Sequence, residues 1–93
     1  MTATSHTRVV TLLNMRGLHA RAATKLVATC NCFEAEVLLR FKGKEVKAHS
    51  LMAVMMLGAG VGNEIELVAK GRQATEVLDA LTELINNRFE EEN

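Results

Sequence analysis

The sequence contains no proline, tryptophan or tyrosine and only two cysteines among its 93 residues. A chain this short has room for one compact core and none for a separate catalytic lobe, which excludes most metabolic enzymes. The cysteines, Cys30 and Cys32, suit neither a stable disulfide nor, without a second Cys or His pair at ligand spacing, a zinc site. We therefore expect a single domain over residues 1–93, frayed at 1–6 and 90–93, with no cofactor and no metal.

An excess of one charge and a long apolar run are also missing. Eleven Lys and Arg balance eleven Asp and Glu, so the chain lacks the positive surplus of nucleic-acid-binding proteins. The longest apolar stretch, Leu51 to Val61, is shorter than the roughly 18 residues that a membrane span requires. The N-terminus has no basic region followed by an apolar one. These absences predict a cytoplasmic protein with reduced thiols and with no nucleic-acid or membrane partner.

The balanced total hides an asymmetry along the chain. Residues 1–50 carry eight Lys and Arg against three Asp and Glu, and residues 51–93 carry three against eight. Basic residues near an anion-handling site would raise the local concentration of an acidic ligand or partner. Chance segregation on a solvated surface explains the same numbers equally well.

Periodic patterns predict seven elements in the order βαββαβα. Strands with alternating or β-branched residues are expected at 8–13, 34–41, 44–47 and 63–70, and helices with apolar stripes at 20–30, 51–57 and 73–87. Asn31 and Gly58 are suitable helix ends, and Lys42-Gly43 is a hairpin turn. This order predicts an α+β fold, an open-faced two-layer sandwich with helices on one face of a four-stranded, mainly antiparallel sheet.

The most informative segment puts His19 between the turn residue Gly17 and the first turn of a helix. Unpaired N–H groups and the positive end of the helix dipole favour an anion there, and Gly17 lets the backbone approach closely. Arg21 adds a planar set of donors that fits phosphate oxygens. Taken singly, His19 is an ordinary helix cap or surface imidazole and Arg21 a solvated side chain, so it is their combination that points to phosphate.

The residues Gly17-Leu-His19-Ala-Arg21-Ala-Ala23 resemble the active-site pattern of the histidine phosphocarrier family of the bacterial phosphotransferase system, HPr and its nitrogen-branch relative NPr. A second family signature, a serine followed by an apolar run, stands as Ser50 to Gly58, and the resemblance covers nearly the whole chain. Residues 33–40 and the acidic tail after Phe89 are more similar to NPr. The choice between sugar uptake and the nitrogen or regulatory branch stays open.

The resemblance implies a monomeric carrier, not an enzyme, with an HPr-like fold of three helices on one face of the sheet. His19 would accept a phosphoryl group on Nδ1 from enzyme I and pass it to a histidine of an enzyme IIA protein. Arg21 would stabilise the group as it moves. The phosphate-binding backbone would be that of Gly17, Ala20, Arg21 and Ala22. The alternative is a regulatory interaction module whose partner binding is switched by phosphorylation of His19 or Ser50.

One residue departs from the family pattern, because Ala22 stands where the family has proline after the active-site arginine. Proline in a first helical turn restricts φ and withholds an N–H. Ala22 should loosen this turn slightly and add a donor near the anion, and we predict that phosphoryl transfer survives.

Further candidates lie around the second signature. In some sugar-branch carriers the serine equivalent to Ser50 is phosphorylated by a dedicated kinase, whereas the simpler interpretation is a helix cap. Exposed methionines suit a surface that fits several partners in turn. The predicted docking face comprises Ala20, Thr24, Lys25, Lys47, Leu51, Met52 and Met55.

Two weaker possibilities complete the set. Gly58 to Gly62 looks like a phosphate-binding loop but lacks the P-loop lysine and does not join a buried strand to a helix, so it is interpreted as a turn. A metal-binding protein would have to use the three histidines and two cysteines, and their irregular spacing argues against it.

Overall fold

The computed structural model describes residues 4–91. Its elements are β1 (His6–Thr11), α1 (Ala20–Cys30), β2 (Glu36–Phe41), β3 (Lys44–Lys47), α2 (Leu51–Met56), β4 (Glu64–Lys70), α3 (Ala74–Asn86) and a final 3₁₀ turn, η1 (Arg88–Glu90). The predicted βαββαβα order is confirmed. The turn η1 is an addition that the periodic patterns did not indicate.

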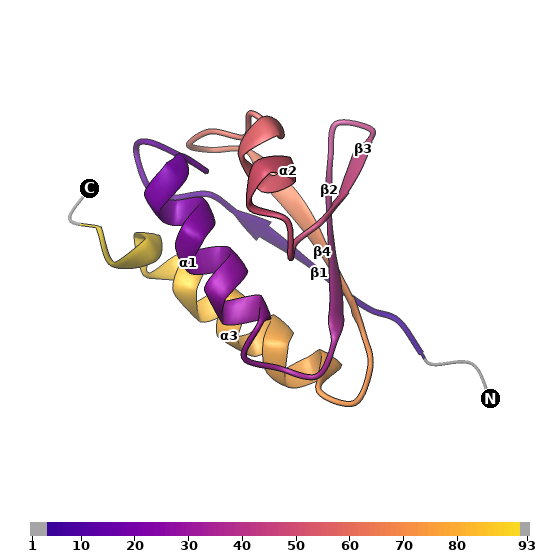
Figure 1. Cartoon of the computed structure of the whole chain (residues 1–93). Helices are drawn as coiled ribbons and strands as arrows, with labels where there is room; N and C mark the ends of the chain where they lie inside the picture. The colour runs from indigo at the N-terminus through magenta and orange to yellow at the C-terminus, as the bar shows by residue number, and fades with distance from the viewer. Residues whose placement is uncertain (1–3, 92–93) are drawn as a thin grey trace.

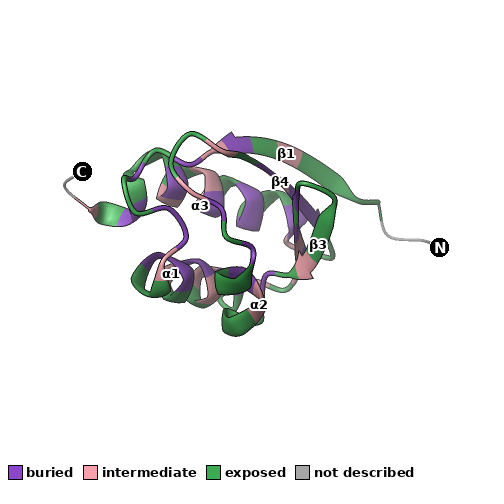
Figure 2. Ribbon diagram, turned by 90° about the horizontal axis from the view of Figure 1, so that it is seen from above, coloured by how far each residue is buried: buried purple, intermediate pink, exposed green. Residues whose placement is uncertain are grey.

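The four strands form one antiparallel sheet in the order β1-β4-β2-β3. The three helices lie together on one side of this sheet, as the two views in Figures 1 and 2 show. On the uncovered side, Arg40 binds Glu45 at 2.6 Å and Glu66 at 3.1 Å across neighbouring strands. The predicted open-faced two-layer sandwich is therefore confirmed, with a group of ion pairs on its outer face.

The hairpin between β2 and β3 has the predicted two-residue turn. Lys42 and Gly43 both adopt positive φ, at 48° and 79°, which matches the twist of the flanking strands. Phe41 pairs with Lys44 at its base.

The core lies between the sheet and the helices. Alternate strand residues such as Val37, Leu39 and Leu67 are fully buried, as the alternation predicted. The helices contribute apolar stripes that pack against them: Ala22, Ala23, Leu26 and Cys30 from α1, and Val77, Leu78, Leu81 and Ile85 from α3. Phe89 of η1 is also completely buried, which joins the end of the chain to this core.

The structure corrects several predicted boundaries. The first strand begins at His6, within the stretch expected to fray, because pairing with β4 continues to Ala69. The second begins only at Glu36, because Glu34 exchanges hydrogen bonds with Gln73 instead of joining the sheet.

At the other end of the chain, within the stretch 90–93 that was expected to fray, Glu90 ends η1 and the side chain of Glu91 is hydrogen-bonded. Residues 1–3 and 92–93 lie outside the described part. None of the helices within residues 4–91 has the length and apolar character to cross a bilayer.

Candidate functional site

The loop before α1 is shaped by a close contact with the loop before β4. Gly17 has φ +61°, and a Cβ built on it would lie 2.5 Å from the Ala59 carbonyl oxygen and 2.6 Å from the Cα of Gly60. The next residue, Leu18, donates its N–H to Ala59 O at 3.1 Å. Glycine is required here by both conformation and space, and the contact sets where α1 begins.

His19 is the N-cap of α1, where the sequence placed it. Its backbone is extended, with φ −73° and ψ 178°, and its carbonyl oxygen accepts from Ala23 N at 2.8 Å. Its Nδ1 accepts from the Arg21 N–H at 3.3 Å. One ring nitrogen therefore faces the amides and the positive dipole end of the helix, the electrostatic environment that favours an anion.

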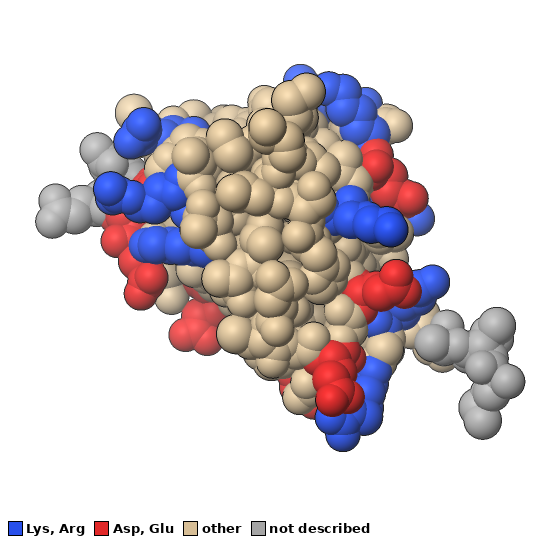
Figure 3. Space-filling model, viewed as in Figure 1, with Lys and Arg blue, Asp and Glu red and all other residues tan. Residues whose placement is uncertain are grey.

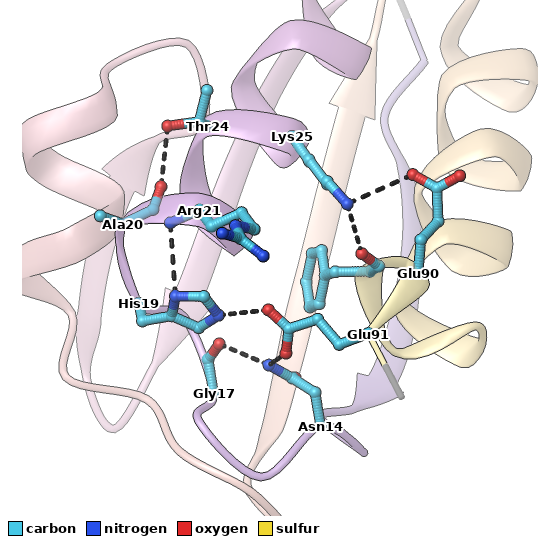
Figure 4. A network of polar contacts seen from close by, with 10 residues as sticks. Asn14, Gly17, His19, Ala20, Arg21, Thr24, Lys25, Glu90 and Glu91 are labelled. Carbon is cyan, nitrogen blue, oxygen red and sulfur yellow. Dashed lines mark hydrogen bonds and ion pairs between the residues drawn. The ribbon is translucent and has the colours of Figure 1, made fainter. Parts of the chain in front are cut away.

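The other ring nitrogen faces the C-terminal segment. His19 Nε2 lies 2.5 Å from Glu91 Oε2, and Asn14 Nδ2 donates to Glu91 Oε1 at 3.1 Å and to Gly17 O at 2.8 Å. Figure 4 shows this network closing around the imidazole. The side chains of His19 and Glu91 are only 15% and 12% exposed.

Glu91 is the site residue that no motif indicated, because its position within an acidic terminal run is typical of a solvated tail. Phe89 was the one available signal, since a large apolar residue two positions earlier requires burial. Burial by itself would raise the pKa of Glu91, but hydrogen bonds from His19 and Asn14 and the charges of His19 and Arg16 lower it below the ordinary 4.5. The side chain is therefore a carboxylate at neutral pH.

Arg21 lies at the start of α1 beside the imidazole (Figure 4). It is exposed, and within residues 4–91 its guanidinium has neither a hydrogen bond nor an ion pair. Its donors are therefore available to an anion bound at Nδ1.

Lys25, a residue of the predicted docking face, contacts the C-terminal turn. Its Nζ donates to the Phe89 carbonyl oxygen at 2.7 Å and lies 3.4 Å from Glu90 Oε1. The ammonium group is thus bound to η1.

The remaining predicted docking residues lie on exposed faces of α1, α2 and β3. Leu51, Met52, Met55 and Met56 are all exposed and form what we call the methionine surface; Met56 was not in the predicted set. Ala20, Thr24 and Lys47 are exposed as well. Figure 3 shows a broad uncharged area over α1 and α2 with charged side chains of both signs at its margins.

Ser50 caps α2, because its Oγ accepts from Ala53 N at 3.3 Å. The predicted cap is confirmed, and the residue is exposed next to the methionine surface.

The weaker candidates lie apart from His19. His49 binds Asn31 Oδ1 at 2.9 Å through Nδ1 and accepts from Val37 N at 3.3 Å, which makes it a clamp between elements. No group of three or more His, Cys, Asp or Glu within residues 4–91 is placed to hold a metal.

The glycine-rich segment before β4 is a turn, as predicted. A surface cavity of about 490 Å³ lies at the β2–β3 hairpin and shares no residue with the site.

The site and fold together define a class of protein. It is a small open-faced sandwich with one imidazole at the N-terminus of a helix, next to an uncharged surface. Comparison with known proteins agrees: the family described as PTS HPr component phosphorylation site matches residues 6–87. The chain belongs to the HPr family and is a phosphocarrier protein of the phosphotransferase system, rather than an enzyme.

Relatives under two names match over most of the chain. Phosphocarrier protein HPr of Pseudomonas putida is 47% identical over 85 residues, covering 90% of this chain and 94% of that protein. Phosphocarrier protein NPr of Escherichia coli K12 is 42% identical over 86 residues, covering 91% and 96%. The family resemblance is confirmed, but identity does not separate the two branches.

Solved structures agree with the fold. An HPr from Thermoanaerobacter tengcongensis superposes with a TM-score of 0.91 at 35% identity, covering 95% of this chain and 99% of that chain. Crh of Bacillus subtilis, described as a domain-swapped dimer, has a TM-score of 0.73 at 35% identity, covering 80% and 85%.

Proposed function

We propose that His19 accepts a phosphoryl group on Nδ1 from the phosphohistidine of enzyme I and passes it to a histidine of an enzyme IIA protein. The observation that carries this proposal is the position of Nδ1 at the N-terminus of α1, 3.3 Å from the Arg21 N–H. Family membership supports the choice of donor and acceptor classes.

In the first step the Nδ1 lone pair of His19 attacks phosphorus while the nitrogen–phosphorus bond of the enzyme I phosphohistidine breaks, and the electron pair returns to that ring. In the second step a ring nitrogen of the enzyme IIA histidine attacks phosphorus, the bond to His19 Nδ1 breaks, and the electron pair returns to Nδ1. Charge on the moving group is met by fixed donors, which is the main contribution a protein makes to phosphoryl transfer. The guanidinium of Arg21 and the backbone N–H groups of Ala20, Arg21 and Ala22 are the donors we assign to this task. The N–H of Gly17, the fourth predicted backbone residue, donates to Asn14 O at 3.1 Å, so Gly17 would serve by close approach only.

The methionine surface, with Ala20 and Thr24, is the proposed docking face for both partners. An apolar area of flexible methionines adapts to different partners, and a carrier must release each one. Lys47 and Lys25 would contribute positive charge at the rim. We expect the carrier to act as a cytoplasmic monomer.

A second candidate is a regulatory module, favoured by the position of Ser50. Its exposed hydroxyl lies at the N-cap of α2, directly beside the methionine surface. Phosphate there would add a dianion to an apolar docking area and oppose binding. Incubation with an HPr serine kinase and intact mass measurement tests this candidate, and an unchanged mass rejects it.

The carrier proposal is tested with phosphoenolpyruvate and purified enzyme I. We expect an acid-labile, hydroxylamine-sensitive phosphoryl group that is absent in His19→Ala and present in the matched control His6→Ala, since His6 lies on exposed β1. Onward transfer to an enzyme IIA domain separates a carrier from a switched module. Phosphate retained in His19→Ala would refute the assignment.

A further inference from the structure

The contact between His19 and Glu91 is not used by any step proposed so far. Glu91 lies 72 positions after His19 in the sequence, yet its Oε2 is 2.5 Å from Nε2, and both side chains are largely buried. The second carboxylate oxygen accepts from Asn14 Nδ2 at 3.1 Å, so each oxygen has its own donor.

This arrangement determines where the ring proton lies. An ionised carboxylate only accepts hydrogen bonds, so Nε2 must be the nitrogen that carries hydrogen. Nδ1 is then the unprotonated nitrogen of the neutral ring, the one whose lone pair can accept a hydrogen bond or attack. That assignment agrees with the independent contact at Nδ1, which accepts the Arg21 N–H.

We propose that Glu91 is a positioning residue for phosphoryl transfer: its carboxylate holds the proton on Nε2 of His19, so that the lone pair of Nδ1 is presented to the phosphoryl donor. The inference rests on the function proposed above and adds a residue to that site. A carboxylate that orients a histidine through its other nitrogen is an established device in both catalytic and metal sites.

The carboxylate of Glu91 also stabilises the charge that develops on the His19 ring during transfer. When the bond from Nδ1 to phosphorus forms and the donor's bond breaks, the His19 ring becomes positively charged while its Nε2 proton stays in place. The carboxylate of Glu91 lies against that proton and balances the new charge. Because it contacts the nitrogen across the ring from Nδ1, it does not occupy the position of the incoming phosphoryl group.

The turn before Glu91 has an unfavourable backbone conformation that is held in place by its surroundings. Arg88, Phe89 and Glu90 all have positive φ, at 56°, 54° and 65°, a conformation that non-glycine residues avoid. Phe89 is completely buried, and its carbonyl oxygen accepts from Lys25 Nζ at 2.7 Å. A left-handed turn of three such residues persists only where its surroundings enforce it, and such turns concentrate at functional sites.

The test compares Glu91→Gln with the matched control Glu90→Gln. Both remove one negative charge at neighbouring positions, but Glu90 is mostly exposed and pairs with Lys25 instead of His19. Glutamine at 91 offers a single acceptor oxygen to two donors. We expect phosphorylation by phosphoenolpyruvate and enzyme I to slow about tenfold in Glu91→Gln, as a charge-assisted hydrogen bond becomes neutral, and to stay within about twofold in Glu90→Gln.

A second readout separates positioning from a merely structural role. Imidazole ¹⁵N chemical shifts should show the Nε2–H form of His19 in the wild type and in Glu90→Gln, and a mixture of both tautomers in Glu91→Gln. Equal rates and tautomers in all three proteins would overturn the proposal. Faster phosphorylation of Glu91→Gln would also overturn it, because the carboxylate would then be a shield.

Failure of this inference is distinguishable from failure of the proposed function. If wild-type protein takes up no phosphoryl group on His19, the function fails. If it does so, and Glu91→Gln matches it in rate and tautomer, only the role of Glu91 fails.

Discussion

Gly17 and the carbonyl oxygen of Ala59 approach so closely that any Cβ on Gly17 would lie 2.5 Å from that oxygen. The loop before α1 and the loop before β4, which are distant in sequence, therefore meet at this contact. The contact fixes the position of the residues that lead into α1 and its N-cap histidine. Gly17→Ala should destabilise the fold by about 3 kcal/mol, because a left-handed conformation and a clash with backbone add together.

Gly58→Ala is the matched control, since Gly58 has φ +70° but no atom within 4 Å of its built Cβ. It should cost only the conformational part, about 1–2 kcal/mol. Urea unfolding measures both variants, and equal losses would contradict the predicted clash.

Glu91 should make stability depend on pH in acid. Its folded-state pKa is lowered below the ordinary 4.5, so the unfolded chain binds its proton first as pH falls. The contribution of the carboxylate to the free energy of unfolding is therefore complete above pH 4.5 and is lost below it, as pH falls through the folded value. The stability difference between wild type and Glu91→Gln should shrink over that window, as followed by urea unfolding at several pH values. A constant difference would be the contrary result.

The two thiols should differ sharply in reactivity. Burial raises the pKa of Cys30 to about 12, whereas Cys32 is exposed in the turn after α1. Because the thiolate is the reactive form, an aromatic disulfide reagent should modify the exposed Cys32 quickly in the folded protein. Cys32→Ser should remove that fast phase, and Cys30 should react only with added denaturant. A fast phase that survives in Cys32→Ser would show that Cys30 is accessible.

Arg21→Ala should impair transfer without affecting stability. The guanidinium makes no contact within the described residues that folding could use, so the free energy of unfolding should change by less than about 0.5 kcal/mol. Loss of a donor to the moving phosphoryl group should slow phosphorylation by about 10²-fold or more. Rapid-quench phosphorylation by enzyme I measures the effect, with Arg40→Ala on the opposite sheet face as control. Equal rates for both variants would remove Arg21 from the site.

Ala22→Pro tests whether the missing family proline weakens the site. Ala22 is buried in the first turn of α1, where proline is tolerated because the first N–H groups have no partner within the helix. We expect the rate of phosphoryl transfer from enzyme I to change by less than about tenfold, since the N-cap position of His19 does not depend on a proline ring at position 22. An increase of several orders of magnitude would mean that the natural site is impaired.

The features that could be predicted from the sequence are those that residues close together in the chain determine, namely helices, strands, turns and caps. The alternation in Glu36–Phe41, the apolar stripe of Ala20–Cys30 and the turn at Lys42-Gly43 repeat over a few positions, and each element formed close to its predicted range. The location of His19 at a helix start is equally local, because a cap is defined by the four or five residues around it.

Tertiary structure alone decided what contacts that histidine from afar. Pairing with β4 extends the first strand back to His6. Burial of Phe89 holds η1 against the core, although the acidic sequence around it is typical of a solvated tail. Lys25 binds that turn, and Glu91 reaches His19 across 72 positions. Hydrogen bonds between single side chains so far apart have no periodicity and become visible only when the packed core has brought both ends of the chain together.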